Sequence, residues 1–199
     1  APPEDIFYTD GAFKSKGEHS LASWAVVSVN RPELNSTGTM KNSSNQKAEL
    51  EAVIQACRIA TENNLKRILI VTDSRYASNG VSKWIERWAE NGWRDNKNKP
   101  VINQETFKRL AKVMENLDVR ITHVKGHQGD KYNELADQLA REALTTEAQV
   151  CATIHSPPDL DQDSDEELRA LREAISANRV TEGYKLKNGT ICMVTPEGD

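Results

Sequence analysis

Long apolar runs, paired cysteines and a basic excess are all missing from this sequence of 199 residues. No stretch of about 18 apolar residues could span a membrane, and no basic-then-apolar segment opens the chain as a secretory signal would. Three cysteines, Cys57, Cys151 and Cys192, are too few for a disulfide framework and indicate a reducing compartment. Cys151, His155 and Cys192 also lack the regular spacing of a zinc motif. We therefore expect no membrane partner and no disulfide or zinc scaffold.

Charge is distributed unevenly along the chain. The formal net charge is −4, which taken alone disfavours a polyanionic partner. Residues 1–146, however, contain 21 Lys and Arg against 19 Asp and Glu, whereas residues 147–199 contain 5 against 11. A slightly basic part of +2 is thus followed by an acidic part of −6. The basic part is compatible with a nucleic-acid partner.

Apolar periodicity predicts an α/β domain over residues 1–147. Strands are expected at 6–8, where a turn follows at Asp10 and Gly11, and at 21–29, 32–40, 67–72 and 118–124. The run at 67–72 is almost continuously apolar, as in a strand buried on both faces. Helical periodicity covers the segments 45–63, 75–79, 82–91, 103–117 and 131–147.

The remaining residues differ in composition. Residues 148–164 are rich in aspartate and proline, which is typical of a linker. Residues 165–199 are expected to form a short helix and then a hairpin, because Asn188-Gly189 separates two alternating runs. A lone hairpin is marginally stable, so this C-terminal extension is expected to need a partner. The start at Ala1, without Met, adds to the expectation of a piece of a longer protein.

Four acidic residues are candidates for a metal site. Asp10 and Asp73 each follow an expected strand, while Glu49 and Asp137 lie on expected helices. Strand ends of an open α/β sheet face one crevice, where four carboxylates would repel one another unless cations lie between them. Oxygen ligands suit Mg²⁺ or Mn²⁺. Each acid alone is better explained as a turn or capping residue, so only the joint pattern favours a site.

The joint pattern resembles ribonuclease H of type 1. Five short motifs occur in the order and at the spacing of that family, namely Tyr8-Thr9-Asp10-Gly11, Asn45-x-x-x-Glu49, Val71-Thr72-Asp73-Ser74, Lys125-Gly126-His127 and Asn133-Glu-Leu-Ala-Asp137. The resemblance implies the ribonuclease H-like fold, an α/β fold with a five-stranded mixed sheet whose first three strands are antiparallel. Flanking helices, with the C-terminal extension following, complete the expected architecture.

The resemblance also implies an activity and its cofactors. The activity is endonucleolytic hydrolysis of the RNA strand of an RNA–DNA hybrid, leaving 3′-hydroxyl and 5′-phosphate ends. Two Mg²⁺ ions, replaceable by Mn²⁺, would be held by Asp10, Glu49, Asp73 and Asp137. His127 would assist by moving a proton or helping the product leave, although by itself it could be a surface histidine in a turn. The other histidines, His19, His123 and His155, are interpreted as ordinary loop, strand and tail residues.

A tryptophan-rich basic segment suggests how a hybrid is held. Lysines and arginines alternate with Trp84, Trp88 and Trp93 between residues 83 and 99, which we call the handle. Basic side chains contact phosphates and indoles stack on sugars or bases; alternatively, Trp84 and Trp88 pack on the core, a role for which Trp93 in its turn is less suited. The resemblance implies further contacts to nucleic acid from Asn45, which would read 2′-hydroxyls, and from Ser44, Tyr76, Asn103, Arg94, Lys97 and Lys99.

The origin of the chain has several interpretations. The domain resembles the ribonuclease H of a retroviral or LTR-retroelement reverse transcriptase polyprotein, which would place reverse transcriptase and integrase regions beside it and locate it in the virion or host cytoplasm. A cellular, intracellular ribonuclease H with an unrelated tail is the alternative. A non-catalytic hybrid-binding module would lack the acids that are present here. An integrase or transposase core shares the fold but uses three acids with a different last spacing and has no handle.

Overall fold

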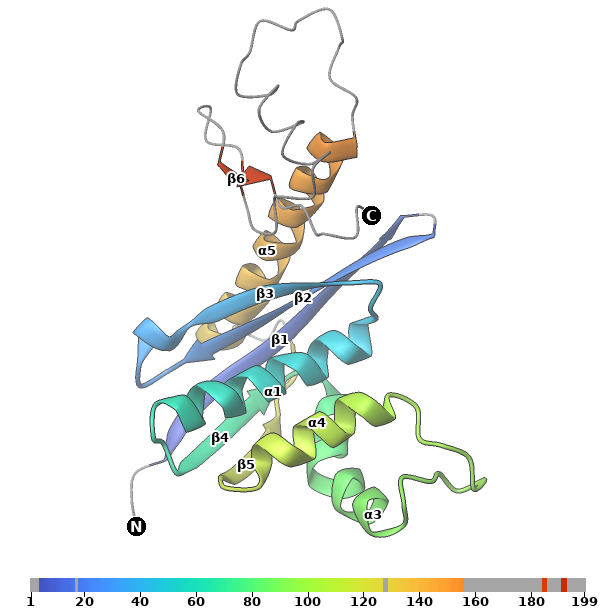
Figure 1. Ribbon diagram of the computed structural model, residues 1–199. Helices are drawn as coiled ribbons and strands as arrows, with labels where there is room; N and C mark the ends of the chain where they lie inside the picture. Colours follow the sequence, from blue (N-terminus) through green and yellow to red (C-terminus); the bar gives the residue numbers. More distant parts are fainter. Residues whose placement is uncertain (1–3, 17, 127–128, 156–183, 186–190, 193–199) are drawn as a thin grey trace, which may run out of the picture. The chain divides into compact units, whose positions relative to one another are not determined.

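The computed structural model describes residues 4–16, 18–126, 129–155, 184–185 and 191–192 (Figure 1). The chain divides into two units, residues 1–144 and 145–199. In the second unit, β6 (Tyr184–Lys185) pairs antiparallel with β7 (Ile191–Cys192), as expected for the hairpin. The hairpin turn at 188–189 and the helix expected at 165–178 lie outside the described residues. The boundaries at 147 and 164 remain predictions.

A five-stranded mixed sheet forms the centre of the first unit, in the order β3-β2-β1-β4-β5. The antiparallel part comprises β1 (Asp5–Lys16), β2 (His19–Ser28) and β3 (Ser36–Lys41). The parallel part adds β4 (Arg67–Thr72) beside β1 and β5 (Asp118–His123) beside β4. This arrangement confirms the expected five-stranded sheet with its first three strands antiparallel.

β1 differs from its prediction in a way that matters for the site. The expected turn at Asp10 and Gly11 is wrong, because β1 continues through both residues to Lys16. β2 pairs with β1 along this whole stretch and provides backbone hydrogen-bond partners on that side. Pairing with β4, in contrast, ends at Thr9 opposite Thr72. Asp10 therefore lies in mid-strand, beside the point where β4 stops.

The third strand was also expected too early. Residues 32–34 form a short 3-10 helix, η1 (Pro32–Leu34), and β3 begins only at Ser36. Proline has no N–H for a strand ladder, so the chain turns before it pairs.

Helices begin where short polar side chains can cap them. α1 (Asn45–Glu62) and α2 (Arg75–Asn79) start after Ser44 and Ser74, whose side chains accept backbone N–H groups. The helix expected at 82–91 begins inside a π-helical turn, η2 (Gly80–Trp84), and continues as α3 (Ile85–Glu90). The last two helices of the first unit are α4 (Gln104–Met114) and α5 (Lys131–His155), of which residues to 144 belong to this unit. The expected end of the last helix at 147 is wrong, because α5 continues to His155.

Helices cover both faces of the sheet. Figure 1 shows α1 and α4 side by side over one face. Between them and the sheet lies the main core, which includes Phe7, Leu50, Val53, Ile54, Ile68, Ile70, Phe107 and Leu110. Neighbouring residues on a strand face opposite ways, so Tyr8, unlike Phe7, faces α5. On that side the Ser23 hydroxyl of β2 donates to the Ala140 carbonyl of α5.

Candidate active site

A glycine brings β1 and α1 into contact at the site. A Cβ atom added to Gly11 would lie 2.8 Å from the Glu49 backbone nitrogen and 2.9 Å from the Ala48 carbonyl carbon. Any side chain at Gly11 would therefore push α1 away from β1. The glycine thus allows Glu49, in the second turn of α1, to lie close to Asp10.

Three of the four predicted acids meet at this point. Carboxylate oxygens of Asp10, Glu49 and Asp73 all lie within 4.8 Å of one another. Asp10 and Glu49 are only 3% and 7% exposed, and Asp73 follows the end of β4. Glu49 Oε2 is buried and accepts no hydrogen bond from any described residue. A buried carboxylate oxygen without a donor, among other carboxylates, suits a divalent cation.

The electrostatics of the cluster lead to the same conclusion. Burial, and then the charge of Asp73, raise the pKa of Asp10 to about 8. Burial, and then the charges of Asp10 and Asp73, raise the pKa of Glu49 to about 9. Without a cation, the cluster therefore retains protons at neutral pH. A bound divalent ion would favour the ionised carboxylates and displace those protons.

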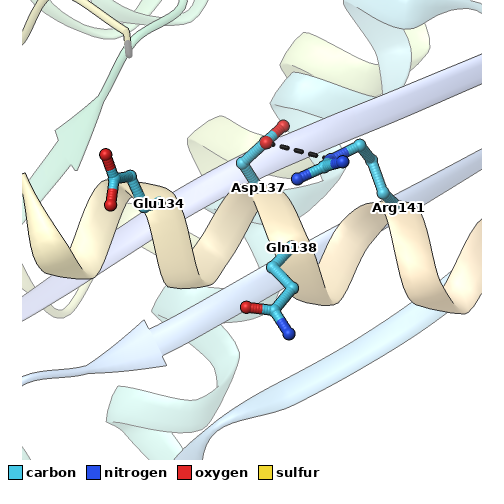
Figure 2. A pocket seen from close by; sticks show the side chains of 4 residues that line it. All are labelled: Glu134, Asp137, Gln138 and Arg141. Carbon is cyan, nitrogen blue, oxygen red and sulfur yellow. Dashed lines mark hydrogen bonds and ion pairs between the residues drawn. The ribbon is translucent and has the colours of Figure 1, made fainter. Parts of the chain in front are cut away.

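The fourth acid, Asp137, stands outside this cluster of three. It lies on α5, where Arg141 Nε contacts its Oδ2 at 3.0 Å, and its charge contributes to the raised pKa of Asp10. A pocket of about 540 Å³ is lined by Glu134, Asp137, Gln138 and Arg141. Figure 2 shows Glu134 and Asp137 projecting from one side of α5, with Arg141 reaching back toward Asp137. Asp137 is thus close enough to influence the cluster, while its carboxylate has a cationic partner of its own.

Residues at and after the end of β5 lie beside Asp73. A Cβ atom on Gly126 would come within 3.0 Å of Asp73 Oδ2, so the predicted Lys125-Gly126 motif lies against the site. His127, the next residue, is outside the described residues, and its expected role stays a prediction. His123, interpreted from sequence as an ordinary strand residue, has its Nε2 atom 3.2 Å from the Asp73 carbonyl oxygen. This contact spans 50 positions, and no local sequence signal indicates it.

Tyr8 and Asp130 were also missed by sequence reasoning. Burial, followed by a hydrogen bond to Asp130, raises the pKa of Tyr8 to about 12, so its hydroxyl remains a donor near neutral pH. The available signal was weak: Asp130 precedes an expected helix, as capping residues do. Nothing in the sequence connects it to Tyr8.

The tryptophans of the handle pack against the core with one part of each side chain and expose the rest. Trp84 and Trp88 are half-buried, with ring centroids 5.5 Å apart, and Trp88 meets Phe107 edge-on at 5.0 Å. Trp93 also packs against the core, contrary to the expectation from its turn. Its backbone adopts a φ of +64°, in the left-handed region. The basic side chains of the handle remain exposed, namely Lys83, Arg87, Arg94, Lys97 and Lys99.

The other expected nucleic-acid contacts lie at helix starts. Ser44 caps α1 by accepting from the Lys47 N–H at 3.2 Å, and Asn45, its first residue, is exposed. Asn103 precedes α4, and its Nδ2 donates to the Tyr76 hydroxyl at 2.9 Å. Tyr76 in turn packs edge-on against Trp84. A hydrogen bond and aromatic packing thus connect Asn103 to the handle.

Sheet order and carboxylate cluster together define the class of nucleases built on the ribonuclease H-like fold. The chain belongs to the RNase H family, whose sequence profile matches residues 2–145. Membership of the RNase H family, the predicted fold and the ribonuclease H enzyme class are confirmed, whereas the retroviral or retroelement assignment stays a prediction.

Relatives of the chain include both cellular and viral proteins. A Ribonuclease H of Syntrophomonas wolfei is 38% identical over 143 residues, covering 71% of this chain and 96% of that protein. The solution structure of the prototype foamy virus RNase H domain has a TM-score of 0.59 and 30% identity, over 71% of this chain and 94% of that one. A foamy viral protease–reverse transcriptase in complex with RNA/DNA hybrid has a TM-score of 0.57 and 26% identity, over 71% of this chain and 20% of that chain.

No described helix combines the length and apolar character needed to cross a membrane.

Proposed function

We propose that this chain hydrolyses the RNA strand of RNA–DNA hybrids with the help of two divalent cations, leaving 3′-hydroxyl and 5′-phosphate ends. The observation that carries the proposal is the buried cluster of Asp10, Glu49 and Asp73, with Glu49 Oε2 lacking a donor. Family membership and the foamy viral complex with RNA/DNA hybrid support the choice of substrate.

The four acidic residues would act as ligands of the two cations. Asp10, Glu49, Asp73 and Asp137 would hold two Mg²⁺ ions, for which Mn²⁺ can substitute. When bound, such a pair supplies positive charge that activates the attacking water and stabilises the leaving oxygen. Water adds to the phosphorus and the bond to the 3′ oxygen breaks. That oxygen takes up a proton to become the 3′-hydroxyl.

Recognition of the hybrid would come from the handle and the helix starts. The exposed basic residues of the handle, Arg94, Lys97 and Lys99 among them, meet phosphates of one strand. Exposed surfaces of Trp84, Trp88 and Trp93 would contact sugars. Asn45 would read 2′-hydroxyls, while Ser44, Tyr76 and Asn103 would contact the DNA strand. Glu86, Glu90 and Asp95 dilute the positive charge of the handle, so we expect modest affinity with a steep dependence on salt.

His127 is proposed to assist turnover by carrying a proton or helping the product leave. His127→Ala should slow the steady-state rate by about a hundredfold, within the usual contribution of acid–base groups, without eliminating cleavage. Single-turnover and steady-state rates, measured on the same hybrid, separate chemistry from product release. His19→Ala, on the exposed start of β2, is the matched control and should leave both rates unchanged. Wild-type rates in His127→Ala would return His127 to an ordinary surface residue.

The biological setting is proposed to be reverse transcription, with reverse transcriptase and integrase regions as neighbours in one polyprotein. Similarity to the foamy viral structures supports this setting. The alternative, a cellular ribonuclease H with an unrelated tail, is supported by the similarity to the Syntrophomonas wolfei protein. A non-catalytic hybrid-binding module is disfavoured because all four acids are present.

One cleavage assay tests the proposed activity. The full chain is incubated with labelled RNA–DNA hybrid, double-stranded RNA or double-stranded DNA, each with Mg²⁺ or with EDTA. We expect cleavage of the hybrid alone, only with Mg²⁺, and product ends that a ligase or polymerase can use as 3′-hydroxyls. Binding without cleavage would support the hybrid-binding module instead. Cleavage of double-stranded DNA would contradict the proposed substrate.

A further inference from the structure

The Tyr8 side chain connects β1 to the start of α5. Its hydroxyl donates to Asp130 Oδ2 at 2.8 Å across 122 positions of sequence. The other carboxylate oxygen of Asp130, Oδ1, accepts the backbone N–H groups of Tyr132 at 3.0 Å and Asn133 at 3.3 Å. One carboxylate therefore caps α5 and ties that cap to the central strand.

Ring packing reinforces the same connection. The rings of Tyr8 and Tyr132 lie 5.5 Å apart at an angle of 35°. A tyrosine held at its hydroxyl and along its ring has little freedom to move. The first turn of α5 is thus fixed against β1 by two kinds of contact.

The residues of this connection share a strand face and a helix side with two of the proposed metal ligands. Tyr8 and Asp10 are two residues apart on β1 and share one face of the strand. Asp130 and Asp137 are seven residues apart, nearly two full turns, so they share one side of α5. The hydrogen bond between Tyr8 and Asp130 therefore lies about 6.6 Å along β1 from Asp10 and about 10.5 Å along α5 from Asp137.

A fixed connection between β1 and the start of α5 affects the site, because Asp10 on β1 and Asp137 on α5 are both acidic. When both carboxylates are ionised, as metal binding requires, they repel each other and favour movement of α5 away from β1. The Tyr8–Asp130 hydrogen bond joins β1 to the residue that precedes α5, so it opposes that movement. The Ser23–Ala140 bond fixes α5 farther along the helix, on β2.

We propose that Tyr8 and Asp130 are positioning residues that set the distance between Asp10 and Asp137, and thereby the affinity for a divalent ion shared by those carboxylates. This inference rests on the proposed two-ion site. Neither residue touches substrate or ion in this proposal. Their effect is carried by the geometry of α5 relative to β1.

The test begins with Tyr8→Phe, which removes the hydroxyl and retains the ring contact with Tyr132. The Mg²⁺ concentration for half-maximal cleavage should rise about tenfold, the lower end of what outer-shell partners of metal ligands contribute. KM for the hybrid should stay within twofold, because Tyr8 is not part of the handle. Mn²⁺ binding to the full chain with an already nicked hybrid, followed by the EPR signal of free Mn²⁺, should show the same loss of affinity.

Two further variants separate positioning from general stability. Ser23→Ala removes the other bond to α5, so it should lower the unfolding temperature without shifting the Mg²⁺ dependence. Asp130→Asn keeps a capping side chain but weakens the partner of Tyr8, so it should weaken Mn²⁺ binding as Tyr8→Phe does. The double variant should add nothing further, because both changes break one bond. Unchanged Mn²⁺ affinity in Tyr8→Phe, or an equal shift in Ser23→Ala, would overturn the positioning role. If the wild type itself binds no Mn²⁺, the proposed two-ion site fails rather than this inference alone.

Discussion

Replacing Asp73 by asparagine is expected to abolish cleavage of the hybrid while leaving hybrid binding intact. The change removes one carboxylate charge from a cluster in which three carboxylates lie within 4.8 Å, and it barely alters side-chain shape. Metal ions supply several kcal/mol of transition-state stabilisation, and about 1.4 kcal/mol corresponds to a factor of ten in rate. A loss of at least about a thousandfold in kcat therefore follows. Initial rates on labelled hybrid, with the Kd measured in EDTA, report both quantities.

Asp118→Asn is the matched control for Asp73→Asn. Asp118 begins β5 beside Arg67, at the other end of the parallel strands, and its side chain is 58% exposed. Loss of such an exposed ion pair costs at most about 1 kcal/mol of stability, so cleavage should stay near the wild-type rate. Wild-type cleavage by Asp73→Asn would show that the cluster is not the catalytic site.

Most elements of the fold could be predicted from local patterns. Residues 67–72 form β4 as their continuous apolar run indicates, and α1 begins at Asn45 behind its serine cap. The prediction of β1 fails where a local turn signal is overruled by pairing with another strand. Asp10-Gly11 has the residues of a turn, yet β2 pairs alongside it and turns the dipeptide into mid-strand. Whether Asp10-Gly11 forms a strand or a turn depends on pairing with β2, which the local sequence does not reveal.

The candidate site was predictable in its residue types but not in its geometry. Family spacing identifies Asp10, Glu49 and Asp73, and the structure brings them together. The reason that Gly11 follows Asp10 becomes visible only when α1 is in place, since any Cβ would strike its backbone. The Tyr8–Asp130 bond connects positions 122 residues apart. Contacts of that kind depend on tertiary packing, which no spacing rule encodes.

Asp10→Asn is expected to stabilise the protein in the absence of divalent ions, although it should also inactivate the enzyme. Burial and the charge of Asp73 raise the pKa of Asp10 to about 8 in the folded state, whereas an unfolded chain loses that proton near pH 4. Between those pH values the folded state binds more protons, so the free energy of unfolding falls as pH rises. Asparagine cannot ionise and can still accept the Gly11 N–H that Asp10 Oδ1 accepts at 2.9 Å.

The expected size of this effect is about 2 kcal/mol at pH 9, below the cost of a fully uncompensated buried charge. For a chain of this length the unfolding temperature should rise by roughly 4–8 °C. Thermal unfolding in EDTA from pH 5 to 9 measures it, and the decline of stability with pH should be shallower in the variant. Adding Mg²⁺ should stabilise the wild type more than the variant, because only a binding-competent folded state gains from the ion.

Asp5→Asn is the control on the same strand: Asp5 pairs with Arg31 at 3.1 Å, so its loss should destabilise the protein. An Asp10→Asn protein that is less stable than the wild type at pH 9 would mean that attraction rather than repulsion dominates the cluster, and that the carboxylates do not require a cation to lie together.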